Sequence, residues 1–517
     1  MSPTRNKAIW LIIFLFLIKT TIVFGSEMDH SGDGWGYACE ILKHNFLSGH
    51  HLLYNITGFI WLQLFAWLPA SPIKLLSWMN VVFSSGILFV TYMIIKRITK
   101  SDTLILSILL FLASCFGFYR YSLENETYIL PLFFGIISIY YLYDLKRSNL
   151  SWIAASIACL YHQIYIFWLI PILVINIQKT RTFRSFWYST ALVLTPYFIA
   201  SYIFNLNIYN IVFQDVNNGL VNNHFNIKNF LIGCINLVRS IIEIHGRIGI
   251  LTLKIPEYTI LGIILLPGLI LVLFKLTKNT FLNIKNNFNS IIKSPEFYIL
   301  ISTILFSFYS NGNAEFMVAI PFLIVFIAIK LFKKQPNDKF KFYLILFGII
   351  NISWNTIYYL IPNCNANINV NTRGKLKLIY SVIHRKDNTK FLSSTGYNKI
   401  TSKNATDTLN ASDALLESNM MDTVVYISSE AAGLYNCFDY DLIWKNQTKT
   451  TEIIFLYPGD SQSIKKYRNL TIYTDLNSDK TINRASLTEY QNIVKQEVIL
   501  LDSIKSKTTI YRISKIF

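Results

Sequence analysis

The apolar run Ile9–Gly25, IWLIIFLFLIKTTIVFG, and the Gly-rich stretch Asp29-His-Ser-Gly-Asp33-Gly-Trp-Gly-Tyr37 that follows it decide the fold. The run follows two basic residues, Arg5 and Lys7, a pattern that a cleaved signal peptide also shows. We interpret it as an uncleaved first membrane span, because further apolar runs follow and the acidic stretch needs an anchor. Two carboxylates in a loop suit chemistry at a membrane surface, whereas they would be costly in the hydrocarbon core.

The composition favours a membrane protein with several helical spans. Of 517 residues, 53% are hydrophobic and only 15% are charged, and the mean hydropathy is +0.40. The net charge of +18 does not indicate nucleic-acid binding, because the basic residues lie in short loops between apolar runs. The sequence therefore predicts a lipid bilayer as a partner and no nucleic acid.

The apolar runs predict about eleven transmembrane helices, with the N-terminus inside and the C-terminus outside. The runs are Ile9–Gly25, Leu75–Ile95, Leu104–Phe118, Tyr128–Leu142, Trp152–Ile177, Phe186–Phe204, Tyr258–Leu276, Phe297–Tyr309, Phe316–Leu331 and Phe342–Ile361. Basic clusters belong on the cytoplasmic side. We place there Lys96/Arg97, Lys146/Arg147, Lys179–Arg184, Lys275–Lys293 and Lys330–Lys341.

This topology is consistent with the basic loops only if three segments do not form ordinary single spans. Ile56–Leu68 is short and rich in Trp and Phe, so we expect it to lie along the membrane. Trp152–Ile177 is too long for one span, and we expect it to break near Tyr161-His162-Gln163. Phe230–His245 contains Arg239 and Glu243, which favours an amphipathic helix on the outer surface.

The composition changes after Ile361, where the chain becomes polar. We predict a transmembrane domain over residues 1–361, with an outer loop and juxtamembrane helices at 26–73, and an extracytoplasmic mixed α/β domain over 362–517. Leu487–Ile504 has a helical pattern. Strand-like runs occur at Lys390–Ser394, Thr423–Ser428, Glu452–Tyr457, Leu470–Thr474 and Thr508–Ile513.

The predicted topology gathers a restricted set of polar residues on the outer face. They combine carboxylates, imidazoles and a cation, as a membrane-embedded active site does: Asp29, Asp33, Tyr37, His50, His51, Arg120, Tyr121, Glu124, Glu126, Tyr128, His162, Gln163, Asn311, Asn313 and Glu315. Each also has a plainer interpretation. Asp29 or Asp33 would cap a helix, and the others would be interfacial, solvated or core residues. Their location on one side carries the hypothesis of a site.

The layout resembles the GT-C superfamily of membrane glycosyltransferases, in particular protein O-mannosyltransferase-like enzymes that use lipid-linked sugars. The resemblance covers roughly residues 1–360. The segments that carry it are Asp33-Gly-Trp-Gly-Tyr37-Ala, His50-His51-Leu-Leu-Tyr54, Asn125-Glu126-Thr-Tyr128, Tyr161-His162-Gln163 and Ala314-Glu315-Phe316. It implies a multi-span protein of the bacterial inner membrane that transfers a sugar from a polyprenyl-phosphate donor to a glycan or protein acceptor.

The resemblance also implies roles for individual residues. A loop carboxylate, Asp33 or alternatively Asp29, takes the proton of the acceptor hydroxyl. Arg120 or a histidine stabilises the departing lipid phosphate. The other residues expected to bind substrate are His50, His51, Tyr54, Glu126, His162 and Glu315. We assign no metal ligands; a divalent metal is compatible with such a site, and the cofactor is not defined by the sequence.

Two other classes of function remain open. A polysaccharide polymerase, flippase or transporter also has many spans and intramembrane charges. The sequence shows no convincing inverted repeat, and a large polar C-terminal domain is less expected in that class. The other class is a non-enzymatic envelope scaffold with the C-terminal domain as its binding module.

Overall fold

A computed structural model describes residues 7–26, 28, 30–42, 44–47, 50–144, 149–205, 207–212, 227–245, 247–254, 256–292, 294–309, 314–331 and 337–364, and the strand segments 390–392, 424–426, 472–477, 497–503 and 508–514. The chain divides into two compact units. The helical unit comprises residues 1–27 and 40–361, and the second unit comprises 28–39 and 362–517. The acidic stretch with Asp33 therefore belongs to the second unit.

Helices account for the described secondary structure up to residue 364. They are α1 (Lys7–Gly25), α2 (Gly32–Leu42), α3 (Tyr54–Leu64), α4 (Pro72–Ile98), α5 (Asp102–Ser114), α6 (Phe116–Tyr121), α7 (Ile129–Leu142), α8 (Asn149–Tyr161), η2 (Gln163–Tyr165), α9 (Ile166–Thr180), α10 (Arg184–Phe204), α11 (Ile208–Val212), α13 (Ile227–Arg239), α14 (Arg247–Lys254), α15 (Pro256–Ile292), α16 (Pro295–Tyr309), η3 (Ala314–Met317), α17 (Ile320–Leu331), α18 (Asp338–Asn355), η4 (Thr356–Leu360) and α19 (Ile361–Cys364). Of these, η4 is a π-helical turn.

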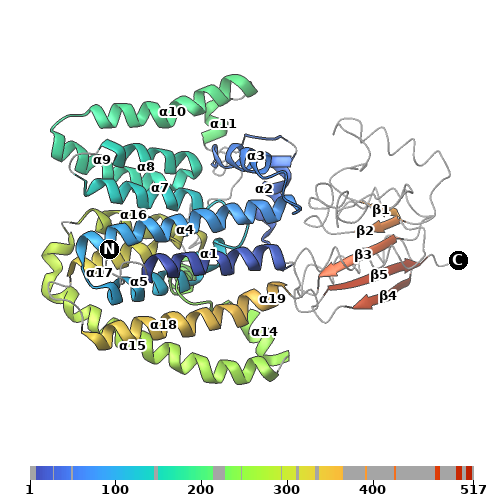
Figure 1. The fold of residues 1–517 in the computed structure, drawn as a ribbon. Helices are drawn as coiled ribbons and strands as arrows, with labels where there is room; N and C mark the ends of the chain where they lie inside the picture. The colour runs from blue at the N-terminus through green and yellow to red at the C-terminus, as the bar shows by residue number, and fades with distance from the viewer. Residues whose placement is uncertain are drawn as a thin grey trace. The chain divides into compact units, whose positions relative to one another are not determined.

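The helical unit is a bundle in which long helices run side by side (Figure 1). α1 packs against α4, α4 against α7, and α7 against α8, while α18 packs against both α5 and α15. Among the described helices, 5 are long and apolar enough to cross a membrane: Lys7–Gly25, Pro72–Ile98, Gln163–Thr180, Pro256–Lys278 and Asp338–Cys364. The count of about eleven spans also includes shorter apolar helices and stays a prediction.

The predicted break in the long run 152–177 is confirmed. α8 ends at Tyr161, and α9 begins at Ile166 after one short 3-10 turn. His162 lies between them in extended backbone, and its ring Nδ1 accepts a hydrogen bond of 3.4 Å from the backbone N–H of Ile164. The imidazole therefore caps the short 3-10 turn that leads into α9.

α3 has the pattern of a helix that lies on a membrane surface. Its exposed apolar side chains, Ile56, Ile60 and Leu64, recur every fourth residue and form one stripe. At 11 residues the helix is too short to span a bilayer. The indole N–H of Trp61 donates to the carbonyl of Leu75 at 2.9 Å and fastens α3 to α4.

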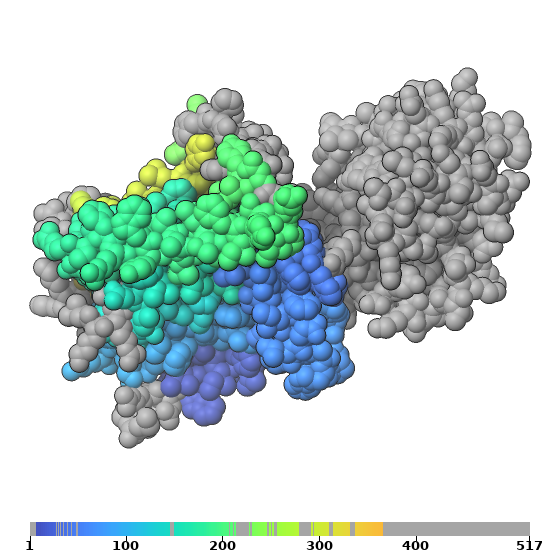
Figure 2. Space-filling view, turned by 90° about the horizontal axis from the view of Figure 1, so that it is seen from above, coloured from blue at the N-terminus to red at the C-terminus, as the bar shows by residue number. Residues whose placement is uncertain are grey.

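Two further helices expose apolar faces. α13 presents Ile227, Phe230, Leu231, Ile235 and Val238. The predicted amphipathic helix over Phe230–His245 is therefore present, but it ends at Arg239, so that Glu243 lies beyond it, and its place on the outer surface stays a prediction. α10 lies along one face of the helical unit, in green in Figure 2, beside the teal α8 and α9. Because α10 exposes large side chains such as Trp187 and Tyr202, this face has the composition of a lipid-facing surface.

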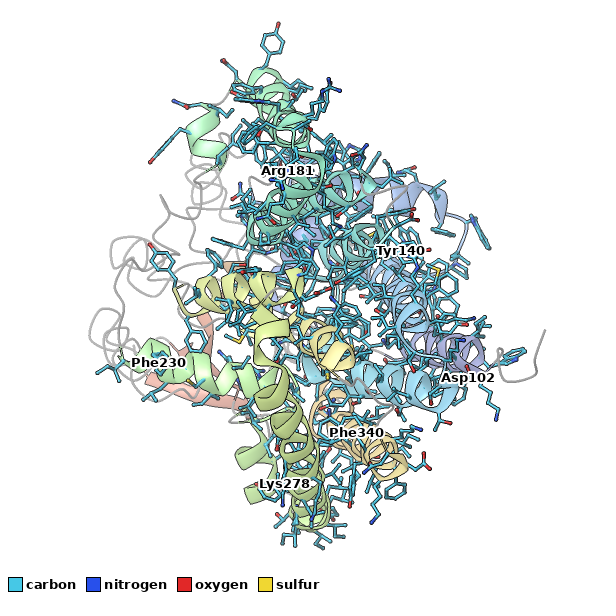
Figure 3. The ribbon with its side chains drawn as sticks, turned by 90° about the vertical axis from the view of Figure 1, so that its left-hand side faces the viewer. Asp102, Tyr140, Arg181, Phe230, Lys278 and Phe340 are labelled. Carbon is cyan, nitrogen blue, oxygen red and sulfur yellow. The ribbon has the colours of Figure 1, made fainter. Side chains whose placement is uncertain are left out.

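The basic ends of several helices meet at one end of the bundle. Figure 3 looks onto that end and labels Tyr140 of α7 and Arg181, which follows α9. Arg97 of α4 donates to the carbonyl of Tyr140 at 3.0 Å, and Lys179 of α9 donates to the carbonyl of Leu142 at 2.9 Å. The basic C-terminal ends of α4 and α9 therefore both contact the C-terminal end of α7, as the alternation of basic loops requires.

The second unit contains a five-stranded sheet in the order β1-β2-β3-β5-β4. The strands are β1 (Lys390–Leu392), β2 (Val424–Tyr426), β3 (Ile472–Asn477), β4 (Glu497–Ser503) and β5 (Thr508–Ser514). β1, β2 and β3 pair in parallel, and β5 pairs antiparallel with both β3 and β4. β1, β2, β3 and β5 overlap four of the predicted strands; the run Glu452–Tyr457 lies outside the described residues.

The predicted helix over Leu487–Ile504 is wrong for its second half. Residues Glu497–Ser503 form β4, and Val498 pairs with Ile513 in an antiparallel ladder. An apolar run of this length fits both a helix face and a strand by its pattern alone. Pairing with the nearby β5 decides the outcome, because strand formation depends on cross-strand neighbours more than on intrinsic preference.

Candidate active site

The segment between α6 and α7 is buried although it carries two carboxylates. Glu124 is 2% exposed and Glu126 is 1% exposed. The side-chain amide of Asn80, on α4, donates to the carbonyl of Glu124 at 2.8 Å and to that of Glu126 at 2.7 Å. The Tyr54 hydroxyl donates to Oδ1 of Asn125 at 2.7 Å. The segment is therefore fixed by α3 and α4, which satisfy its buried polar groups.

Arg120, at the end of α6, forms a two-pronged ion pair with Glu124. Its Nε donates to Oε1 and its Nη2 donates to Oε2, both at 3.1 Å. The Tyr359 hydroxyl, from the π-helical turn η4, also donates to Oε1 of Glu124. The cation predicted to bind the lipid phosphate is thus already oriented by one buried carboxylate.

A second ion pair of the same spacing lies close to the first. Arg239 Nε donates to Glu243 Oε2 at 3.5 Å, and the indole of Trp354 donates to the Glu243 carbonyl at 2.8 Å. Burial raises the pKa of Glu243, while the charges of Arg239 and Arg120 lower it. Arg120 is therefore close enough to interact electrostatically with the carboxylates of both Glu124 and Glu243.

The charges of three carboxylates act on the side chain of Tyr121. Burial is the main reason that its pKa is raised well above the ordinary value, and the charge of Arg120 opposes this shift. Three carboxylates raise the pKa further, those of Glu315, Glu126 and Glu124. The Tyr128 hydroxyl donates to Oε2 of Glu315 at 2.7 Å. The sequence-predicted residues Arg120, Glu126 and Glu315 are thus brought together.

Three imidazoles form a second group beside the carboxylates. The ring centroid of His51 lies 4.1 Å from that of His50 and 4.4 Å from that of His162. The ring of Tyr128 lies 5.4 Å from that of His162 and links this group to Glu315. His51 uses both ring nitrogens, Nδ1 toward the Tyr161 carbonyl at 3.2 Å and Nε2 toward the Thr127 hydroxyl at 3.4 Å.

His51 and His162 are held neutral. Burial, followed by the charges of His162 and His50, lowers the pKa of His51 well below its ordinary value. Burial, followed by the charge of His50, does the same for His162. With Nδ1 facing a carbonyl, the neutral His51 carries its proton on Nδ1, and Nε2 accepts from Thr127.

We expect these imidazoles to make the protein less stable in acid. Below pH ~6.5 a histidine of the unfolded chain takes up a proton that the folded protein excludes, so stability falls as pH falls. Each imidazole contributes up to about 1.4 kcal/mol per pH unit in that range. Thermal unfolding in detergent between pH 7.5 and 5.5 measures the loss, and His51→Asn should reduce its slope relative to wild type. Equal slopes for the two proteins would contradict this assignment.

The two loop aspartates have different outcomes. Asp29 lies outside the described residues. Asp33 is exposed in the first turn of α2, where the hydroxyl of Ser31 accepts the backbone N–H of Gly34 at 2.9 Å. Ser31 therefore caps α2, and the interpretation of Asp33 as the cap is wrong. The carboxylate of Asp33 is therefore exposed and does not cap the helix.

The sequence missed two residues that shape the site. The sequence places Glu124 on the outer face without a role of its own, although its spacing of four residues from Arg120 indicates an ion pair if the segment is helical. Tyr359 contacts Glu124 across a separation of 235 residues in the chain, and no local sequence pattern predicts this contact.

No metal-binding site is found in the described part of the chain. Among those residues, no group of three or more His, Cys, Asp or Glu side chains is arranged to hold a metal ion. The three clustered histidines are included in that search, and both nitrogens of His51 face protein atoms. We therefore assign no residue here to a metal.

Comparison with known proteins identifies a shared fold. No protein-family model matches the chain, and no curated protein matches it in sequence. It is similar in structure to ArnT from Cupriavidus metallidurans bound to undecaprenyl phosphate, with a TM-score of 0.55, 9% identity and coverage of 98% of each chain. The apo state of that protein gives a TM-score of 0.53 at 10% identity, covering 98% of this chain and 97% of that one.

At these identities the likeness shows the fold. The chain has the same overall fold as ArnT, and at the level of the fold this agrees with the resemblance drawn from its short motifs. The apolar helices and this fold make it an integral membrane protein.

Proposed function

We propose that this protein is a GT-C-type glycosyltransferase that moves a sugar from a polyprenyl-phosphate donor to a glycan or protein acceptor on the outer face of the membrane. The observation that carries the proposal is the fold, which is similar over 98% of the chain to a protein bound to undecaprenyl phosphate. Arg120 and the carboxylates around Tyr121 supply groups of the kind that such a reaction needs.

The proposed orientation follows from the two ends of α7. Its C-terminal end meets Arg97 and Lys179, whereas Tyr128 precedes its N-terminal end. Its 14 residues separate these ends by roughly 21 Å. We place the basic end in the cytoplasm of a bacterium, the candidate site at the outer surface of the inner membrane, and residues 362–517 as an extracytoplasmic α/β domain.

Each group has a chemical role in the proposed reaction. Asp33, or alternatively Asp29, takes the proton of the acceptor hydroxyl as it attacks the sugar. Arg120 pairs with the lipid phosphate as negative charge develops on it. The remaining residues bind or orient the sugar through hydrogen bonds or ring contact: Tyr54, Glu126, Glu315, His50, His51 and His162.

The topology can be tested with single cysteines at Lys100, Lys285 and Lys390. We expect Lys100 and Lys285 to be labelled only when a reagent reaches the cytoplasm, and Lys390 to react with an impermeant reagent from outside. Reporter fusions at the same positions provide an independent reading. Finding Lys100 and Lys390 on the same side would rule the orientation out.

Recognition of the donor lipid can be tested by thermal unfolding of the purified protein. A ligand that binds only the folded state raises the unfolding temperature. Undecaprenyl phosphate should therefore raise it in a concentration-dependent way, whereas undecaprenol, which lacks the phosphate, should raise it much less. Equal shifts with the two lipids would show that the phosphate is not recognised and would contradict the proposal.

A further inference from the structure

The geometry of Arg120 leaves a defined part of its guanidinium available. A guanidinium has five N–H donors in a planar fork. Glu124 occupies two of them, at Nε and Nη2, both at 3.1 Å. Three N–H groups remain, on the edge away from the carboxylate. The Arg120 side chain is 17% exposed and that of Glu124 is 3% exposed, so the carboxylate is buried behind an accessible cation.

Glu124 is in turn held at both of its ends. Its backbone carbonyl accepts from Asn80, and its carboxylate accepts from the hydroxyl of Tyr359. The ring of Tyr359 packs edge-on against Phe116 with centroids 5.3 Å apart. Tyr359 belongs to a π-helical turn, a rare form that often occurs at functional sites. A chain of fixed groups therefore runs from η4 through Glu124 to Arg120.

This arrangement has little value as a stabilising device alone. Removing two charges from water costs about as much as their attraction returns, so a buried ion pair is weak evidence for stability. A bidentate pair does fix the plane and direction of a guanidinium. It also gives the cation a counter-charge while no phosphate is bound.

We propose that Glu124 and Tyr359 are positioning residues, which hold the guanidinium of Arg120 with its three remaining N–H groups toward the phosphate of the donor lipid. This inference rests on the proposed function and adds residues that the sequence did not assign. Neither residue touches the donor; both act through Arg120. Their effect should therefore disappear when position 120 cannot form a fork.

Two conservative substitutions separate position from charge. Glu124→Asp keeps the negative charge but is one methylene shorter, so it cannot reach Arg120 and Tyr359 in the same geometry. Tyr359→Phe removes only the hydroxyl. We expect each to weaken binding of undecaprenyl phosphate about three- to tenfold, measured with purified protein in nanodiscs. Tyr358→Phe is the matched control, because its hydroxyl lies on the same turn and donates to the carbonyl of Tyr258 instead.

The decisive readout is a double-mutant cycle with Arg120→Lys, which retains the charge without the fork. Adding Glu124→Asp or Tyr359→Phe to Arg120→Lys should change lipid affinity by less than twofold. Losses that add in full would indicate a purely structural role and overturn the inference, as would wild-type affinity in both single variants. Wild-type affinity in both Arg120→Lys and Arg120→Ala would instead show that Arg120 does not bind the lipid phosphate at all. Unfolding temperatures close to wild type confirm that each variant is folded.

Discussion

Asp33→Asn is expected to abolish sugar transfer while the protein stays folded. Asparagine has nearly the same shape but cannot take a proton from the acceptor hydroxyl. General-base catalysis is typically worth about 10²–10⁴-fold, so turnover should fall by at least 10²-fold. Because Asp33 is exposed in the first turn of α2 and does not cap it, the free energy of unfolding should change little. Turnover of a polyprenyl-phosphate sugar and thermal unfolding together measure both effects.

Asp102→Asn is a matched control for this variant. Asp102 also lies in the first turn of a helix, α5, whose cap is likewise a serine, Ser101. The control should retain wild-type turnover. Asp29→Asn tests the alternative base: activity kept in Asp33→Asn and lost in Asp29→Asn would assign the role to Asp29. Activity kept in both variants would end the proposed mechanism and favour a scaffold or a transporter.

Arg120→Ala should weaken binding of a polyprenyl-phosphate donor by more than about tenfold. A hydrogen bond to a charged group contributes about 1.5–3 kcal/mol, and each 1.4 kcal/mol is a factor of ten in affinity. Arg120→Lys should recover only part of the loss, because lysine presents a point charge rather than a fork. Equilibrium binding of undecaprenyl phosphate in nanodiscs provides the measurement.

Arg239→Ala separates a specific site from a general effect of removing a cation. Arg239 pairs with a glutamate four residues on, as Arg120 does, and its side chain is 18% exposed against 17% for Arg120. We expect a much smaller change in donor affinity for this control. Donor affinity equal to wild type in Arg120→Ala would make Arg120 an interfacial anchor, and His50 or His51 would become the next candidates for the phosphate.

Much of the helical unit was predictable because its signals are local. The break at His162 follows from a run too long for one span with polar residues at its middle, and η2 forms there. The apolar stripe of α3 was also predictable from a local signal, since the segment is too short to span a bilayer and is rich in Trp and Phe. β4 was missed because its run Glu497–Ser503 fits a helix face as well as a strand, and only pairing with β5 distinguishes them.

The candidate site was predictable in its composition and only partly in its connections. The topology alone places Arg120, Glu126 and Glu315 on one side, and in the structure the charges of all three act on Tyr121. The contact of Tyr359 with Glu124 depends on how α18 continues into a π-helical turn beside α6. Such long-range contacts follow from packing, which a single sequence does not display.

The most direct test of the central claim is the fate of a donor lipid in proteoliposomes. The protein would be reconstituted with undecaprenyl phosphate carrying a radiolabelled sugar, across a panel of sugars, and supplied with envelope extract as acceptor. The proposed function predicts acceptor-dependent release of undecaprenyl phosphate and appearance of the label in the acceptor, both lost in Asp33→Asn. A donor that stays chemically intact across the panel while it moves between leaflets would contradict the claim and indicate a lipid transporter.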